Sequence, residues 1–329
     1  MRSSKQSCDV VSQTHGGLSR LSGRGEVWMA GTALCFAAAN LFDQVAMTRA
    51  DPFVAAIVKA FLVSAFALLV LAASPQRRLA LLSEGWRRWL EAARIYAFAG
   101  LVSEVIGTAA FFQAMKLGGI NIATPTVQTW LIWAALGGAV FLQERVQPKT
   151  FLGLALSVAG LVLLAYFQQR GLPFTPEWPK AIPFGLIAAF GWAGSTVLIR
   201  KGQTAGIDRY VGLSIQFLTA LLGLLIVILC TNRGALFLQT PARTYGCLFV
   251  SALLAGVLGM VCMYIALALS PVERVIPIVA CYPVLAAIAG ALFLGNYLNV
   301  GMVTGIVLVA GGVAICKGKW PVGLGRWTR

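Results

Sequence analysis

The chain has 329 residues, of which 59% are hydrophobic and only 11% charged, and its mean hydropathy is +0.82. A soluble domain carries about 25% charged residues, so this composition excludes a water-soluble fold. At roughly 20 apolar residues per membrane crossing, the chain has room for ten helices and short connections. We therefore expect an all-α membrane protein that forms a single membrane domain.

The formal net charge is +15, and the positions of the basic residues decide what this charge means. Nearly all 26 Lys and Arg residues fall between the apolar runs. This pattern is typical of membrane proteins rather than of a basic binding face, so no nucleic-acid partner is expected. The lone histidine, His15, stands in the polar N-terminal segment, which excludes a histidine-rich metal site within the membrane. The seven cysteines show no CxxC spacing and are expected to be small buried hydrophobic residues.

Apolar runs bounded by Pro, Gly and charged residues predict ten transmembrane helices. In chain order they cover residues 27–47, 53–73, 95–116, 122–142, 150–168, 181–200, 210–230, 245–269, 275–294 and 300–316. Residues 1–26 are polar and lack an apolar core, so they do not resemble a signal peptide. They are expected to be a disordered tail or to precede the true start of translation, and residues 317–329 are expected to form a basic cytoplasmic tail.

The distribution of basic residues predicts the orientation. With the N-terminal segment assigned to the cytoplasm, nineteen Lys and Arg residues lie on that side and six on the other, while Lys59 lies within a helix. The excess predicts a multi-pass protein of the inner membrane of a bacterial-type cell, with both termini in the cytoplasm.

An internal repeat links the two halves of the chain. A shift of 152 residues aligns 112–164 with 264–316 without a gap, and it superimposes Pro125 on Pro277, Gly138 on Gly290, Gly153 on Gly305 and Gly160 on Gly312. The repeats, 27–168 and 179–316, each hold five predicted helices. Because five is odd, the second repeat must be inverted in the membrane. Two inverted five-helix repeats around a central cavity are typical of secondary transporters.

The stretch from Ala114 to Gly160 resembles the drug/metabolite transporter superfamily, in its ten-helix branch made of two EamA-like halves. The matching features are the proline within the fourth helix, the exit from Gly138 to Glu144, and the two glycines of the fifth helix. The resemblance implies a basket of helices around a central cavity, with the fifth and tenth helices at the back. The second repeat departs from the pattern, because Asn296 stands where the first repeat has Glu144. The family carries many kinds of substrate, so membership alone names none.

Three ionisable residues fall well inside predicted helices, where charge is costly and often functional. Asp43 and Lys59 are expected at similar depth on consecutive helices, either as a structural ion pair or as substrate contacts. Glu104 is expected near the middle of the membrane, with no basic residue at its depth in its own helix. It is the strongest candidate for a substrate or proton site, and the alternative is a protonated carboxyl group packed between helices.

Polar and aromatic residues extend this candidate site. Asn40, Asp43 and Gln44 share a face of the first helix, and Glu104 and Thr108 share a face of the third. Such stripes either line a cavity or fasten helices together. Gln128 of the fourth helix belongs to the same class. The candidate walls for an apolar or aromatic ligand are Trp192, Tyr264 and Tyr282.

These features favour a secondary transporter that exports a small amphipathic metabolite, an amino acid or a related compound, with protons as the candidate coupling ion. Multidrug or quaternary-ammonium efflux is the alternative, and a membrane-embedded enzyme is the remote one. The sequence holds no GxxxxGK[ST], GxSxG or HExxH pattern, so no enzyme activity, metal or cofactor is expected. Gly301 and Gly305 form a GxxxG pair that predicts either a homodimer contact or packing within the bundle.

Overall fold

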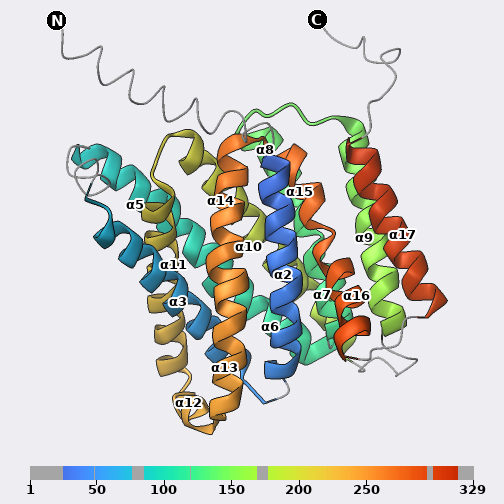
Figure 1. Ribbon diagram of the computed structural model, residues 1–329, viewed down its shortest axis with the longest axis horizontal. Coiled ribbons are helices and arrows are strands. Elements are labelled where there is room, and N and C mark those ends of the chain that lie inside the picture. The colour runs from blue at the N-terminus through green and yellow to red at the C-terminus, as the bar shows by residue number, and fades with distance from the viewer. Residues whose placement is uncertain are drawn as a thin grey trace, which may run out of the picture.

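A computed structural model describes residues 25–47, 49–75, 85–118, 120–168, 177–294 and 299–317. Within these ranges the chain is almost entirely helical and contains no strand, and its helices pack side by side into one bundle (Figure 1). The predicted tails at 1–26 and 317–329 lie almost wholly outside the described residues.

In the first half of the chain, the described residues form three unbroken helices and two broken ones. The unbroken helices are α2 (Gly25–Met47), α3 (Pro52–Ala73) and α9 (Pro148–Gln168). One broken helix consists of α5 (Trp86–Gly100), the π-helical segment η1 (Leu101–Gly107) and α6 (Thr108–Gly118). The other consists of α7 (Ile120–Gln128) and α8 (Trp130–Phe141). Asp51 caps α3 by accepting a 2.8 Å hydrogen bond from the Phe53 amide, and Pro52 suits the first turn.

The second half repeats this order. It contains α10 (Trp178–Thr204), α11 (Arg209–Cys230), the short α12 (Ala235–Gln239), α13 (Ala242–Ser251), the π-helical η2 (Ala252–Gly259), α14 (Met260–Leu269), α15 (Val272–Val279), α16 (Tyr282–Leu294) and α17 (Val300–Lys317). Asp208 caps α11, as Asp51 caps α3, by accepting from the Tyr210 amide at 2.8 Å.

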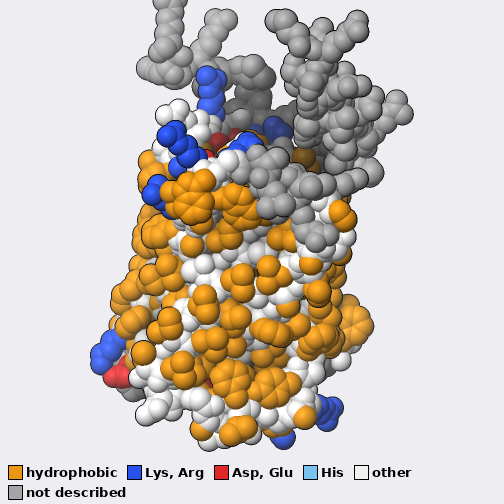
Figure 2. Space-filling model, turned by 90° about the vertical axis from the view of Figure 1, so that its left-hand side faces the viewer, with side chains coloured by type: hydrophobic (Ala, Val, Ile, Leu, Met, Phe, Trp, Pro, Cys, Tyr) orange, Lys and Arg blue, Asp and Glu red, His pale blue; other side chains and the backbone are white. Residues whose placement is uncertain are grey.

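Within the described part of the chain, seven helical segments are long and apolar enough to cross a membrane. They are Pro52–Ala73, Trp86–Met115, Pro148–Phe167, Trp178–Thr204, Arg209–Cys230, Ala242–Leu269 and Val272–Phe293, and the apolar Val300–Cys316 is shorter. On the side of the molecule shown in Figure 2, hydrophobic side chains cover the middle while Lys and Arg gather toward the two ends. The chain is thus a multi-pass membrane protein.

The expected boundaries need two corrections. The fourth and ninth helices, expected to be continuous over 122–142 and 275–294, are each interrupted, between α7 and α8 and between α15 and α16. The third helix was expected to begin at residue 95, but α5 already begins at Trp86. Its first turns carry Arg87, Arg88 and Glu91 beside Trp86 and Trp89. The amphipathic pattern of residues 74–93 predicts a short helix along the membrane surface, whereas the residues from Trp86 onward form the start of α5.

Irregularities occur at matching points of the two halves. The π-helical segments η1 and η2 end at Gly107 and Gly259, which are separated by the 152 residues of the sequence repeat. Helices α7 and α15 each contain a proline, Pro125 and Pro277, and each ends within a few residues of it. Proline lacks an amide hydrogen and breaks helices, so equivalent prolines give equivalent breaks.

Helices α9 and α17 pack against each other through glycines at one edge of the bundle (Figure 1). A Cβ on Gly160 would lie 2.7 Å from the Gly305 carbonyl oxygen, and the converse distance is also 2.7 Å. Gly153 and Gly312 face each other in the same way. Because the later residue of α9 faces the earlier residue of α17, the two helices run antiparallel. Gly301 faces Phe167 of α9, so the GxxxG pair serves packing within this chain.

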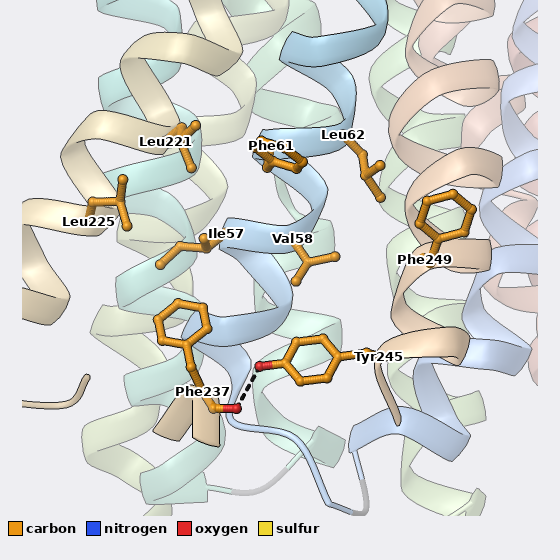
Figure 3. Close-up of a pocket in the computed structure, with 9 residues that line it drawn as sticks. All are labelled: Ile57, Val58, Phe61, Leu62, Leu221, Leu225, Phe237, Tyr245 and Phe249. Carbon is orange, nitrogen blue, oxygen red and sulfur yellow. Dashed lines mark hydrogen bonds between the residues drawn. The ribbon is translucent and has the colours of Figure 1, made fainter. Parts of the chain in front are cut away.

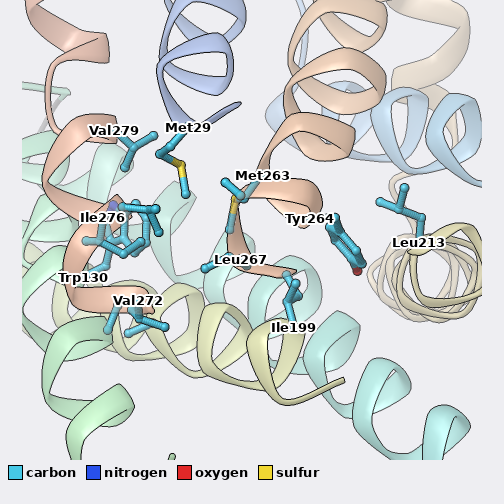
Figure 4. Close-up of a cluster of buried hydrophobic side chains, with 14 of the residues drawn as sticks. Met29, Trp130, Ile199, Leu213, Met263, Tyr264, Leu267, Val272, Ile276 and Val279 are labelled. Carbon is cyan, nitrogen blue, oxygen red and sulfur yellow. The ribbon is translucent and has the colours of Figure 1, made fainter. Parts of the chain in front are cut away.

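The centre of the bundle is a cluster of buried side chains from both halves (Figure 4). Its members include Met29, Trp130, Ile199, Leu213, Tyr264 and Ile276. Many neighbouring positions are alanine, such as Ala188 and Ala189, which are fully buried. Small residues let membrane helices approach closely, and the two halves therefore share one core.

One end of the bundle collects both ends of the described chain. Glu26 of α2, Lys149 of α9, Glu273 of α15 and Cys316 of α17 line one small polar pocket there. We call it the Arg200 end, because Arg200 of α10 forms an ion pair beside it, as described below. Helix α12 lies at the opposite end (Figure 1).

Candidate substrate site

Asp43 and Lys59 form the ion pair that their depths predict. The Lys59 ammonium nitrogen lies 2.7 Å from Oδ2 of Asp43, and the Ser251 hydroxyl donates to Oδ1 at 2.6 Å. The two charged side chains are 30% and 23% exposed. Since Ser251 belongs to α13, this cluster connects helices α2 and α3 of the first half to the second half.

Glu104 lies in the π-helical segment η1, and Ser103 Oγ donates to its Oε1 at 3.2 Å. The Ser103 carbonyl oxygen accepts from Thr108 Oγ1 at 3.4 Å and from Trp192 Nε1 at 3.2 Å. A π-helical turn disturbs the regular backbone pairing and often occurs at functional sites. Here Thr108 and Trp192 hold the turn that carries Glu104.

Close contacts between η1 and the second half fix this turn. A Cβ on Gly191 of α10 would lie 2.5 Å from the Val102 carbonyl oxygen, and a Cβ on Gly100 would meet the Gln216 carbonyl of α11. Only glycine allows such an approach of two backbones. The position of Glu104 is therefore set by helices α10 and α11, which sequence inspection of its own helix could not show.

Glu104 has a basic neighbour after all. Lys59 of α3 lies within electrostatic range of Glu104, while its ammonium group is bonded to Asp43. The sequence expectation concerned the helix of Glu104 alone, and this basic neighbour belongs to another helix. With all three groups ionised, the Asp43–Lys59–Glu104 cluster carries one net negative charge, which suits a cationic group or a proton.

Tyr264 belongs to a buried hydrogen-bond chain next to this cluster. Its hydroxyl donates to Gln216 Oε1, and Gln216 Nε2 donates to Ser195 Oγ at 3.3 Å. Tyr96 stacks on Tyr264 with ring centroids 5.9 Å apart and accepts a hydrogen bond from Gln203. Tyr264 is also within electrostatic range of Glu104. Sequence inspection missed Gln216, although it is a polar residue within an otherwise apolar run of α11.

Gln128 and Tyr282 bond to each other. Gln128 Nε2 donates to the Tyr282 hydroxyl at 3.1 Å, and Trp130 Nε1 donates to Gln128 Oε1 at 3.0 Å. Gln128 ends α7 and Tyr282 begins α16, so this contact ties together the helix breaks of the two halves. Phe36 of α2 packs edge-on against Tyr282. These contacts favour a helix-fastening role.

The structure thus brings most of the predicted site residues around α2, α3, η1, α10 and α14. Asp43 and Lys59 are bonded to each other, Glu104 lies within electrostatic range of Lys59 and Tyr264, and Trp192 and Thr108 hold the Glu104 turn. Tyr282 is in electrostatic range of Asp43, which links the Gln128 contact to the same region. Asn40 is partly exposed on α2, and the side chain of Gln44 lies outside the described residues.

A second ion pair lies at the Arg200 end. Arg200 Nε donates to Glu144 Oε1 at 2.9 Å, and the side chains are only 14% and 11% exposed. Arg200 Nη1 donates to the carbonyl oxygen of Leu267, in the last turn of α14, at 2.6 Å. Glu144 Oε2 accepts from the Val272 amide, at the start of α15, at 2.8 Å. Each charge therefore sits at the helix end that its sign favours, and the pair links α10 and the segment after α8 to the ends of α14 and α15.

Known proteins share this sequence and fold. An uncharacterized transporter of Archaeoglobus fulgidus is 26% identical over 223 residues, which cover 67% of this chain and 74% of the relative. An uncharacterized transporter from the cobO 3' region of a Sinorhizobium species is 26% identical over 145 residues, covering 43% of this chain and 96% of the relative. A solved crystal structure matches the fold with a TM-score of 0.68 at 19% identity, over 88% of this chain and 95% of its own.

The EamA-like transporter family matches the chain twice, at residues 23–166 and 179–316. A transporter of this family acts on small molecules within a lipid bilayer, so family and relatives point to transport rather than to catalysis. The resemblance to the drug/metabolite transporter superfamily is confirmed. This membrane transporter belongs to the EamA-like transporter family.

Proposed function

We propose that the chain is a secondary transporter that exports a small amphipathic metabolite, an amino acid or a related amine, across the inner membrane. The cluster of Asp43, Lys59 and Glu104 carries the proposal. It places two carboxylates and one ammonium group within a membrane bundle, where each isolated charge would be costly. An amino acid carries both charges, so its ammonium group would bind Glu104 while its carboxylate would bind Lys59.

The proposal includes ten membrane crossings in two inverted five-helix repeats. The contacts between α9 and α17 support the inversion, because Gly153 faces Gly312 and Gly160 faces Gly305. In the repeat, Gly153 is equivalent to Gly305 and Gly160 to Gly312. An operation that exchanges the two repeats therefore converts the Gly153–Gly312 contact into the Gly160–Gly305 contact. A two-fold axis that exchanges antiparallel helices is perpendicular to them, and for membrane-spanning helices it therefore lies in the membrane plane.

We further propose that the Arg200 end faces the cytoplasm and that both termini lie there. The nineteen basic residues assigned to that side support this orientation. The buried Glu144–Arg200 pair closes this end more firmly than the more exposed Asp43–Lys59 pair closes the region near the other end. Transport then requires the Glu144–Arg200 contacts to open when the site faces the cytoplasm.

The proposal also couples substrate export to proton movement through Glu104 of the Asp43–Lys59–Glu104 cluster. Burial disfavours the charged form of a carboxyl group, so Glu104 binds a proton when no cation is present. A substrate ammonium group would replace that proton, and the two would cross the membrane in opposite directions.

Quaternary-ammonium or multidrug efflux is the second candidate. Trp192 bonds to the residue before Glu104, Tyr264 lies within electrostatic range of Glu104 and Tyr96 stacks on Tyr264, and aromatic faces attract organic cations. A quaternary cation, however, donates no hydrogen bond to Glu104 and offers no carboxylate to Lys59. We therefore rank this candidate below an amino acid or primary amine.

The test is substrate exchange by the purified protein in liposomes. The panel holds amino acids, primary amines and quaternary ammonium compounds, and protein-free liposomes are the control. The proposal expects exchange of compounds with a primary ammonium group and an apolar remainder, and its loss in the Asp43→Asn, Glu104→Gln double variant. Exchange of quaternary cations alone supports the second candidate, and exchange that survives in the double variant rejects this site.

A further inference from the structure

An apolar groove lies on the outside of the bundle, between helices of the two halves (Figure 3). Its volume is about 490 Å³, and it is lined by Ile57, Val58, Phe61 and Leu62 of α3, Leu221 and Leu225 of α11, Phe237 of α12, and Tyr245 and Phe249 of α13. Ligand pockets in proteins typically measure roughly 300–1,000 Å³. The groove is thus large enough for part of a ligand.

The lining offers no free polar atom. Eight of the nine side chains are hydrocarbon, and the Tyr245 hydroxyl is already used, because it donates to the Phe237 carbonyl oxygen at 2.8 Å (Figure 3). This bond also fixes α12 to α13 as the floor of the groove. An occupant must therefore present hydrocarbon along the whole groove.

The groove opens toward lipid. Phe61 is 57% exposed and Phe249 48% exposed, and both project from segments that are apolar enough to cross a membrane. Nearby on α11, Leu222 and Ile226 are also exposed. Because the surrounding medium is the bilayer itself, the hydrocarbon available at this position is a lipid acyl chain.

Two arginines flank the floor of the groove. Arg233 precedes α12, and its guanidinium carbon lies 5.7 Å from the centroid of the Phe53 ring. Phe53 packs on the cluster of Ile57, Leu224 and Ile228 next to the groove. Arg243 follows α12, in the first turn of α13, and is exposed. They are two of only six basic residues on the side with fewer positive charges.

We propose that the groove binds an anionic phospholipid, with one acyl chain against Phe61 and Phe249 and its phosphate group beside Arg233 and Arg243. A chain that moves from bilayer to groove exchanges one apolar medium for another, so hydrophobic burial alone gives no selectivity. Shape and headgroup charge must decide. Basic residues beside the membrane surface attract anionic lipids, and a guanidinium group recognises phosphate by paired hydrogen bonds.

Native mass spectrometry of the full chain, purified in detergent with equal phosphatidylglycerol and phosphatidylcholine of the same acyl chains, tests the proposal. Wild-type protein should retain phosphatidylglycerol preferentially. Arg233→Gln with Arg243→Gln should lower the bound phosphatidylglycerol by roughly fivefold for each arginine removed. Val58→Trp should fill the groove and displace both lipids.

Matched controls lie on other surfaces. Arg145→Gln removes an exposed arginine near the Arg200 end, and Leu292→Trp enlarges an exposed apolar residue of α16. Both should bind lipid like the wild type. Thermal unfolding of every variant separates lost lipid from lost fold.

Three results would overturn the proposal. Equal retention of both lipids by the wild type would remove the headgroup selectivity. Unchanged retention in Val58→Trp, with the fold intact, would leave only non-specific boundary lipid. Equal losses in the control variants would show that the groove and its arginines have no special role.

Discussion

Among the described residues, the Glu144–Arg200 and Asp43–Lys59 ion pairs, both partly buried, differ in how their charges are held. Glu144 and Arg200 bond to each other and to the backbone of α14 and α15, so both charges have fixed partners. Lys59 bonds to Asp43 and lies within electrostatic range of Glu104, so in the proposed mechanism it can respond to either carboxylate. A charge with fixed partners holds helix ends together, whereas a charge with a choice of partner can respond when a substrate or a proton arrives.

The largest effect is expected for Glu104→Gln, which keeps the size and hydrogen bonding of the side chain and removes its charge. Loss of one partner of a buried charge pair typically costs 2–5 kcal/mol in binding, so transport of a cationic substrate should fall by roughly 100-fold or more. Rates in liposomes across a pH series measure this. A wild-type rate and pH profile would make Glu104 a packing residue.

The next effect concerns the fixed pair. Arg200→Met leaves Glu144 without its charge partner, and breaking a buried pair costs about 3–5 kcal/mol of stability. Thermal unfolding in detergent should show a clear drop. The double variant Glu144→Leu, Arg200→Met removes both charges and should lose less than Arg200→Met alone.

An exposed pair provides the control for this comparison. Lys180 and Glu177 are 2.7 Å apart on the surface, and Lys180→Gln should leave the unfolding temperature nearly unchanged because surface ion pairs contribute little. If Arg200→Met behaved like Lys180→Gln, the Glu144–Arg200 pair would not be holding the helix ends.

A smaller effect is expected where the two halves touch outside the charged clusters. Gly160→Ala places a Cβ 2.7 Å from the Gly305 carbonyl oxygen, and overpacking of this kind costs about 1–3 kcal/mol. Gly311→Ala on α17 is the matched control, since its nearest neighbour would be Leu156 at 4.0 Å. Equal thermal stability of the two variants would contradict the close α9–α17 contact.

The contrast also shows what a single sequence can reveal. The Asp43–Lys59 pair was predictable, because both residues lie on consecutive helices whose depths follow from residue counts. The Glu144–Arg200 pair was not, since Arg200 was counted only as a loop charge and its partner comes from the other half of the chain. Two further neighbours were also not predictable: Gln216 beside Tyr264 and Lys59 near Glu104. Each pair joins two different helices, so its proximity depends on how the helices pack.

The irregular segments of the helices likewise include features that the sequence signals and features that it does not. Residues 122–142 and 275–294 were expected to form continuous helices, but each is interrupted shortly after its proline, Pro125 or Pro277, because proline removes a backbone donor. The two π-helical segments, η1 and η2, were not predictable from the sequence. They end at Gly107 and Gly259, and a glycine within a membrane helix can have many roles. The repeat spacing of 152 residues becomes informative only after the two π-helical segments are seen at equivalent points.

The central claim is that Glu104 exchanges a proton for the ammonium group of the substrate. Proton release on substrate binding tests it most directly, with purified protein in weakly buffered solution and a pH-sensitive dye. The account predicts close to one proton released per bound substrate in the wild type, and none in Glu104→Gln at substrate concentrations that saturate it. Equal proton release by the two proteins would contradict the claim.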